Sequence, residues 1–345
     1  MNTTAQRKAT LGRAGGWFGR NTALVALLFA AVIGALFVPN FLTRLNLTAI
    51  LFQYSIIGLL ALGQLLVILT AGIDLSQGSV VALTSIVVAS LMLHVGLLPA
   101  VLGGLLAGTL IGVTSGLIVS RTKIPAFVVT LGMLGIARGL ALLISDAKPI
   151  AIENEAFINF GTSLVAGIPV SALIWVAASV LVWYFLKYRR TGRYIYALGG
   201  GEESARLSGV DVRQVKLLVY GLCGLLTAMG GVIWTARLSS GSPIGGVNYE
   251  LESIAAVIVG GGSLFGGIGT VGGTLVGVLL FGTINSILNL MGISPYWQGT
   301  IKGVLILLAV ALSQVRRTSG ASTSREAQPP QAARPAREGE TAWKQ

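Results

Sequence analysis

The sequence predicts an all-α polytopic membrane protein with about ten transmembrane helices, on three grounds. Hydrophobic residues make up 54% of the 345 residues and charged residues only 10%, whereas soluble domains carry roughly 25% charged residues. Several apolar stretches exceed the roughly 18–20 residues that a helix needs to cross about 30 Å of hydrocarbon. Most of the 24 Lys and Arg residues also lie in segments that can all face one side of a membrane.

The apolar stretches, taken in order, give ten candidate spans with both chain ends in the cytoplasm. This count returns the chain to the cytoplasm at Arg121, Arg189 and Arg316, as expected because basic segments beside spans stay inside. Eight or nine spans remain possible, since the second and eighth are interrupted or short. The expected spans are 22–40, 48–70, 77–95, 98–119, 125–145, 167–187, 215–236, 251–264, 270–291 and 296–315.

The ends of the chain differ from this domain in composition. Residues 1–21 form a basic cytoplasmic arm, and residues 22–317 form the transmembrane domain. The apolar stretch that begins at Thr22 is long for a signal peptide and lacks a small-residue cleavage site, so we expect an uncleaved first span. Residues 318–345 lack apolar periodicity, which is typical of a disordered tail. The net charge of +12 therefore follows from topology and does not indicate nucleic-acid binding.

One polar segment, from Lys187 to Lys216, interrupts the apolar sequence between the sixth and seventh expected spans. Glu202 and Arg206 stand at i, i+4 with the acid first, the favourable order for a helical pair. Gly209 falls where a left-handed helix cap belongs. We expect a short exposed helix in this loop, residues 188–213, on which a soluble partner docks.

Asp74 is an ionisable residue in an otherwise apolar stretch, together with Ser76 after the second expected span. A charge at the centre of a membrane helix costs about 2.5–3.5 kcal/mol on insertion scales. Asp74 either takes part in a gate or caps the third span by accepting hydrogen bonds from the N–H of Ser76 or Gln77. We favour the capping role. It is compatible with a role in a gate, because either role requires Asp74 to stabilise the turn.

A second interruption is the glycine-rich segment 260–273, which contains Gly260, Gly261, Gly262 and Ser263. Each glycine in a helix interior costs about 1 kcal/mol relative to alanine. Irregular backbone at membrane depth is tolerated only when buried in protein or lining a wet cavity. We expect a half-helix followed by a turn; the alternative is close packing of helices through small residues.

Isolated polar residues in the spans give weaker signals. Asn285 and Asn289 share one helix face and are candidates for contact with a polyhydroxylated solute, as is Gln64 in the second span. Hydrogen bonding between packed helices is the alternative for all three. Arg138 and Lys302 are expected to extend toward the interface.

The sequence contains no motif for ATP hydrolysis or proton coupling that would supply the energy for transport. No GxxxxGK[ST] phosphate loop, metal-ligating cluster or nucleophile–base arrangement is present, so neither a cofactor nor a metal site is expected in this chain. No series of carboxylates or histidines that could relay protons lies within the spans. The chain is therefore expected to be a transport subunit and not an enzyme or a proton-driven carrier.

Five segments together carry a resemblance to a known family. They are Gly192 to Val210, Ile68 to Ser76, Arg237 to Ser240, Tyr249 to Val257 and Gly260 to Gly273. In this order, over roughly residues 23–316, the chain resembles the permeases of ribose-type sugar ABC transporters. The tail after Thr318 has no counterpart in that pattern.

The resemblance implies an inner-membrane subunit that works in an assembly. Its implied partners are a second permease copy in a homodimer or heterodimer, a periplasmic binding protein, and a cytoplasmic ATPase that holds the ATP and Mg²⁺. By position, the ATPase-docking helix would comprise Glu202, Glu203, Ser204, Ala205, Arg206, Leu207 and Ser208. The implied function is import of a monosaccharide; the alternatives are import of nucleosides or another small polar solute, or a stand-alone secondary carrier.

Overall fold

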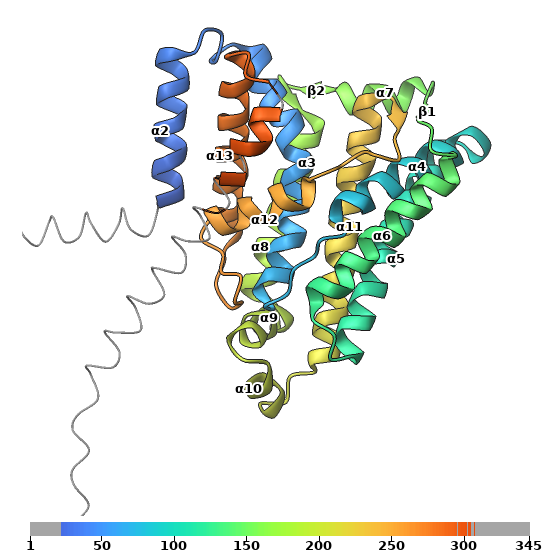
Figure 1. Ribbon diagram of the computed structural model, residues 1–345, viewed down its shortest axis with the longest axis vertical. Helices are drawn as coiled ribbons and strands as arrows, with labels where there is room; N and C mark the ends of the chain where they lie inside the picture. Colours follow the sequence, from blue (N-terminus) through green and yellow to red (C-terminus); the bar gives the residue numbers. More distant parts are fainter. Residues whose placement is uncertain (1–21, 295, 302, 305–306, 308–345) are drawn as a thin grey trace, which may run out of the picture.

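The computed structural model describes residues 22–294, 296–301, 303–304 and 307, and it is mostly helical (Figure 1). The basic arm 1–21 and the tail 318–345 lie outside the described residues. The elements are α2 (Thr22–Phe37), α3 (Arg44–Leu69), α4 (Gln77–Val95), α5 (Leu97–Arg121), α6 (Ala126–Ser145), β1 (Ile150–Ala151), α7 (Glu155–Thr162), β2 (Leu164–Val165), β3 (Ile168–Pro169), α8 (Val170–Tyr188), α9 (Arg190–Gly200), α10 (Glu202–Leu207), α11 (Val212–Leu238), β4 (Ser240–Gly241), α12 (Tyr249–Val259) and α13 (Val271–Leu290).

The expected spans match the helices closely over the first half of the chain. Among the described residues, seven helices are long and apolar enough to cross a membrane, and α2 is a shorter apolar helix of 16 residues. The eighth expected span is an 11-residue helix, α12, which ends at Val259, so the short helix lies just before the glycine-rich segment 260–273 instead of within it. Helical residues occur from position 296 onward, but most of the tenth expected span lies outside the described residues. The structure therefore supports a polytopic membrane protein and leaves the count of ten as a prediction.

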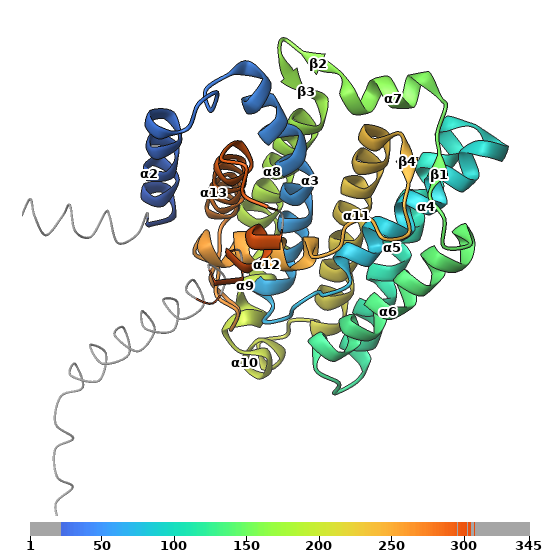
Figure 2. The ribbon, with the colours of Figure 1, turned by 45° about the horizontal axis from the view of Figure 1, so that its top comes forward.

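Helix α3 forms the centre of the molecule. Every residue from Tyr54 to Leu69 is buried, as expected of a helix that is apolar on all sides. The helices α8, α11, α12 and α13 pack against it, and α2 lies at the edge beyond α13 (Figures 1 and 2). The core thus runs along the axis of the bundle.

Small residues allow α5 and α11 to pack closely. A Cβ at Gly112 would overlap the carbonyl oxygen of Tyr220, and one at Gly224 would lie 2.5 Å from the carbonyl oxygen of Gly108. Such close backbone approach is how helices associate in lipid, where burial of apolar surface gives no advantage. The outer faces of α5 and α6 instead expose leucines, including Leu106 and Leu143, which suits contact with lipid acyl chains.

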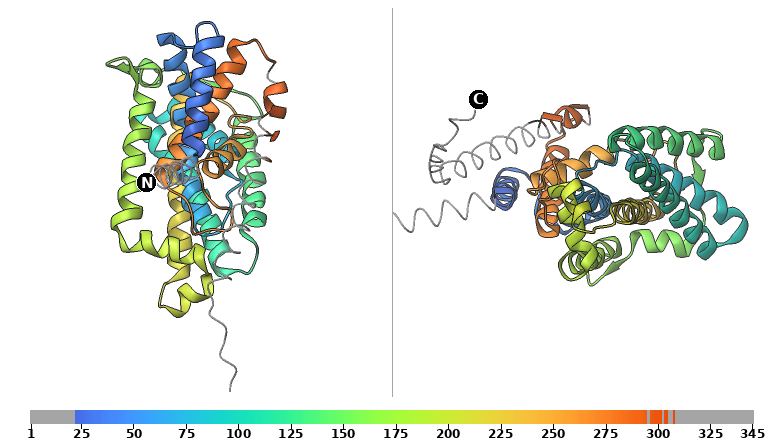
Figure 3. Two further views of the ribbon diagram at one scale, coloured as in Figure 1. Left: turned by 90° about the vertical axis from the view of Figure 1, so that its left-hand side faces the viewer. Right: turned by 90° about the horizontal axis from the view of Figure 1, so that it is seen from below.

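The two ends of the bundle differ in structure. One end carries α7 and two short antiparallel pairs, β1 with β4 and β2 with β3. The other end carries α9 and α10 (Figure 1), and from below these helices lie across the bundle near the end of α3 (Figure 3). The expected cytoplasmic loop and the expected outer loop are therefore at opposite ends of the molecule.

Candidate functional site

The short helix expected in the polar loop is present as α10. It is followed by Ser208 and then by Gly209, whose φ of +84° gives the expected left-handed cap. The N–H of Gly209 donates to Arg206 O (3.0 Å) and that of Val210 donates to Ala205 O (3.1 Å). These are the bonds that satisfy the last carbonyls of a helix. The sequence signal for this end of the helix was therefore correct.

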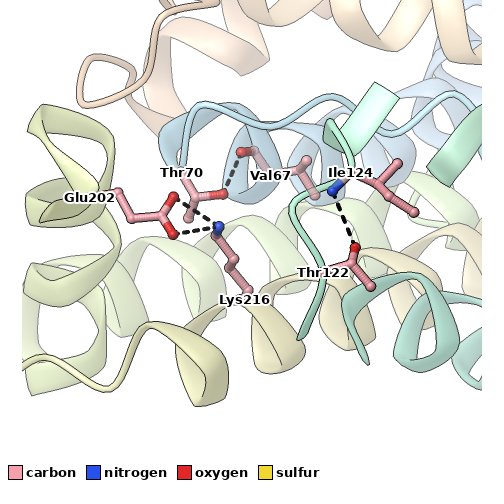
Figure 4. Close-up of polar contacts among 6 residues, drawn as sticks. All are labelled: Val67, Thr70, Thr122, Ile124, Glu202 and Lys216. Carbon is pink, nitrogen blue, oxygen red and sulfur yellow. Dashed lines mark hydrogen bonds and ion pairs between the residues drawn. The ribbon is translucent and has the colours of Figure 1, made fainter. Parts of the chain in front are cut away.

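The ion pairs of α10 differ from the prediction. Arg206 pairs with Glu203 (2.7 Å), one turn away, instead of with Glu202. Glu202 binds Lys216 of α11 (2.9 Å), and Figure 4 shows this pair with the last turn of α3. The difference comes from tertiary structure. Helix α11 lies beside α10 and brings Lys216 to the carboxylate of Glu202, which the sequence spacing had assigned to Arg206. The hydrogen bond that Arg206 donates to the Glu203 carboxylate raises the pKa of Arg206.

The surface of α10 is open. Glu202, Glu203, Ser204, Arg206, Leu207 and Ser208 are exposed, and only Ala205 is buried. Leu207 is 80% exposed and adds one apolar contact point, although a single exposed leucine does not by itself indicate a partner. The helix therefore presents charges of both signs and one large apolar side chain at the tip of the molecule.

Sequence reasoning missed a second helix in the same loop, α9. Its apolar face buries Ile195 and Leu198 against the core, while its arginines remain exposed. The signal was available as an amphipathic period, but three consecutive glycines at 199–201 stand before α10 and hide the end of the preceding helix. In the structure, Gly199 and Gly200 belong to α9 and only Gly201 forms the joint between the helices.

Gly199 is the point where α9 touches two other segments, and we call this contact the glycine junction. A Cβ at Gly199 would overlap both the carbonyl oxygen of Leu69 and the backbone nitrogen of Gly267. That nitrogen donates to Leu69 O (3.0 Å), and the hydroxyl of Tyr196 donates to Gly269 O (2.9 Å). The glycine junction thus joins α9, the end of α3 and the segment between α12 and α13.

Asp74 holds the turn between α3 and α4. Its Oδ1 accepts from the N–H (2.8 Å) and the hydroxyl (2.6 Å) of Ser76, and its Oδ2 accepts from the Cys223 thiol (3.4 Å). The predicted bond to Ser76 is confirmed, and Asp74 is buried among protein side chains at 2% exposure. Its place near the cytoplasmic interface stays a prediction. Thr130 of α6 donates to Ile73 O (3.0 Å) and fastens the same turn.

Two buried amides surround this turn. In the orientation that satisfies both of its polar atoms, Gln64 donates to Asp74 O (3.1 Å) and accepts from Asp74 N (3.2 Å). Gln77 donates to Leu60 O (2.8 Å) and accepts from the Ser253 hydroxyl (2.5 Å). Gln77 therefore connects α3, α4 and α12, a role that no local pattern indicated.

The glycine-rich segment after α12 is a turn, as predicted. The N–H of Gly262 donates back to Val257 O (2.8 Å), and Gly261 has a φ of +95°. Gly260 lies against Gly273 so closely that a Cβ on either would overlap the other's carbonyl oxygen. The backbone N–H of Ser263 donates to Ile268 O (2.9 Å), which closes the loop. The segment thus shows the turn that was favoured and also the small-residue packing that was its alternative.

Asn285 and Asn289 are not part of this group. Both lie in the C-terminal half of α13, where Ser286 donates to Asn46 (2.8 Å) near the start of α3, whereas Asp74 follows the end of α3. Asn289 accepts from Gln298 (2.8 Å), while Oδ1 of Asn285 is buried without a hydrogen-bond partner among the described residues. The candidate path residues thus form two groups at opposite ends of the bundle.

Arg138 does not extend toward the interface as predicted. Its Nη1 donates to Pro243 O (2.7 Å) and Gly245 O (3.1 Å) in the non-helical segment between α11 and α12. Lys302 lies outside the described residues. The prediction for Arg138 failed because the two carbonyls come from a segment more than a hundred residues away.

Comparisons with known proteins agree with this architecture. Residues 46–310 match the family described as branched-chain amino acid transport system / permease component. The ribose import permease protein RbsC of Escherichia coli K12 is 44% identical over 87% of this chain and 95% of its own length. In the same organism, the D-allose transport system permease protein AlsC is 39% identical over 87% and 92%, and the L-arabinose transport system permease protein AraH is 37% identical over 85% and 89%. No solved structure matches the chain.

Proposed function

Because the chain belongs to the branched-chain amino acid transport system / permease component family, we propose that it is the membrane-spanning subunit of an ATP-driven sugar importer. It is a multi-pass protein of the inner membrane and not itself an enzyme. A separate ATPase binds ATP and Mg²⁺, and a periplasmic binding protein delivers the solute. The relatives named for ribose, allose and arabinose favour a monosaccharide over a nucleoside.

One observation carries the mechanism: the exposed helix α10 is connected to the interior through α9. Its joint with α9 is a single residue, Gly201, and α9 contacts the end of α3 and the 266–269 segment at the glycine junction. A displacement of α10 by the ATPase would therefore move two non-helical segments, the turn after α3 and the segment between α12 and α13. In transporters, the solute binds at discontinuous helices of this kind, and the pathway opens there.

The orientation follows from charge. The loop containing α9 and α10 carries five arginines, whereas the segment with α7 carries acids, Glu153 and Glu155 among them. Basic loops stay in the cytoplasm, so α10 faces the ATPase and α7 faces the binding protein. Both chain ends then lie in the cytoplasm, and the ten-span count is retained.

The buried residues have separate roles in this proposal. Gln64, Asp74 and Ser76 shape the turn that closes the cytoplasmic end, and Gly260, Gly261, Gly262 and Ser263 form the second turn beside it. Asn285 and Asn289 lie toward the outer end, where they would meet solute first. A second copy of the chain, as a homodimer, completes the pathway, and lipid surrounds the dimer.

The test is a charge exchange in α10. Arg206→Glu and Glu203→Arg should each reduce sugar-stimulated ATP hydrolysis and uptake of radiolabelled D-ribose, D-allose or L-arabinose by about tenfold in proteoliposomes that contain the partner ATPase and binding protein. The reason is that each change reverses one charge on the exposed surface while the rest of the fold is untouched.

The double variant Glu203→Arg/Arg206→Glu separates docking from helix stability. It keeps the ion pair within α10 but exchanges the charges that a partner meets. If α10 is the docking surface, the double variant stays uncoupled and co-purifies less ATPase. Recovery of uptake in the double variant would show that the pair serves only the helix, and the docking assignment would be wrong.

A further inference from the structure

A polar cluster lies where the chain is non-helical between α11 and α12. The backbone of Ser242 exchanges two hydrogen bonds with the Ser85 hydroxyl (3.1 Å each), and Arg138 binds two carbonyls of the same segment. Ser85 and Arg138 stand near the middle of the spanning helices α4 and α6. The segment therefore runs deep within the bundle, where irregular backbone is tolerated only inside protein or beside a wet cavity.

Three side chains from three helices meet at this break, and we call them the outer polar cluster. Gln53 of α3 donates through Nε2 to the hydroxyl of Tyr249, the first residue of α12 (3.1 Å). Arg237, in the last turn of α11, donates through Nη1 to Oε1 of the same Gln53 (3.1 Å). All three are half-buried, so the cluster reaches the molecular surface instead of closing into the core.

The surroundings of the cluster are aromatic. The guanidinium of Arg237 lies over the ring of Phe52, 5.4 Å from its centroid. Glu252, one turn along α12, lies near the hydroxyls of Tyr54 and Tyr249. The cluster therefore combines a guanidinium, an amide and a phenol with apolar ring faces.

This combination suits a small sugar. Each sugar hydroxyl needs both a donor and an acceptor, which an amide and a phenol supply, while a guanidinium adds donors in a fixed plane. The C–H face of a sugar ring can lie against an aromatic face, in keeping with sites that are mostly apolar with a few placed polar groups. An ionisable side chain within the membrane is also costly, and such residues mark solute pathways.

We propose that the outer polar cluster, Gln53, Arg237 and Tyr249, contacts the monosaccharide as it passes through the outer half of the bundle. This inference rests on the proposed function, because it assumes that the solute crosses this chain. It adds the residues that meet the sugar and the place where they do so, at the break preceding α12.

The first arm of the test measures water access without transport. With Cys223→Ser as background, Gln53→Cys is treated in intact cells with a membrane-impermeant thiosulfonate reagent, which reacts with thiolates and so needs water at the site. Leu140→Cys, on the exposed face of α6, is the matched lipid-facing control. We expect Gln53→Cys to react at least tenfold faster than Leu140→Cys, and saturating transported sugar to slow the reaction.

The second arm measures transport in proteoliposomes with D-ribose, D-allose and L-arabinose. Tyr249→Phe and Gln53→Leu should raise the concentration for half-maximal uptake or lower uptake about tenfold, whereas Tyr184→Phe on the exposed face of α8 should match wild type. If the wild type imports none of the sugars, the proposed function fails, and labelling at position 53 still reports on the path. Unlabelled Gln53→Cys, or wild-type uptake by both cluster variants, would overturn the inference and leave a helix-packing contact.

Discussion

Replacing Gly199 by alanine tests whether force passes from α9 to the turns inside the bundle. The added Cβ would overlap the carbonyl oxygen of Leu69 and the backbone nitrogen of Gly267. Both groups belong to backbone, and they are hydrogen-bonded to each other (3.0 Å). Neither can rotate away as a side chain would, so α9 itself must move.

The magnitude follows from two terms. Forcing extra bulk into a packed contact costs roughly 1–3 kcal/mol, and loss of the bond between Gly267 and Leu69 adds about 0.5–1.5 kcal/mol. Since 1.4 kcal/mol is a factor of ten, the sum shifts α9 from the joined to the displaced position by about 10- to 1,000-fold. If only the joined position couples, and the two positions are similar in free energy in the wild type, transport falls by about tenfold or more.

The assay compares Gly199→Ala with Gly200→Ala in proteoliposomes with the ATPase and binding protein. Gly200 is the neighbouring residue of α9, and a Cβ there would meet nothing within 4 Å. Gly199→Ala should lose sugar uptake while the ATPase still co-purifies, because α10 remains exposed. Gly200→Ala should transport like wild type. Equal uptake by the two variants would refute a mechanical role for the glycine junction.

Two further predictions concern topology and the core. In a Cys223→Ser background, Thr162→Cys at the end of α7 should react with an impermeant thiol reagent in intact cells. Ser204→Cys in α10 should react only after the membrane is opened, since both positions are exposed and differ only in the side they face. Labelling of position 204 in intact cells would contradict the assigned orientation. Asp74→Leu should lower the melting temperature of the detergent-solubilised protein far more than Asp74→Asn. The leucine leaves the two donors of Ser76 unpaired at about 1–3 kcal/mol each, whereas asparagine keeps one acceptor for them. Wild-type melting temperatures in both variants would exclude a structural role for this carboxylate.

Most of the fold could be predicted from the sequence because its signals are local. The length and composition of apolar stretches located the spanning helices, and the excess of glycine after α12 predicted the break at Gly260. The helix α10 was also found from local signals, since Gly209 sets its end. These features depend on properties of neighbouring residues, which the sequence displays directly.

Tertiary structure alone decided which residues meet. Lys216 replaced Arg206 as the partner of Glu202 because α11 returns beside α10. Arg138 turned inward because two carbonyls of a distant segment lie within its reach.

The candidate site depends on the same kind of contact. Gly199 is important because α9, the end of α3 and the segment between α12 and α13, which are distant in sequence, meet there. Asn285 lies away from Asp74 because α13 runs along α3 from one end of the bundle to the other. Local preference fixes where a membrane helix begins and ends, since water and lipid act on each segment separately. The pairing of helices depends on shape and hydrogen bonds between segments, and these exist only after the chain has folded.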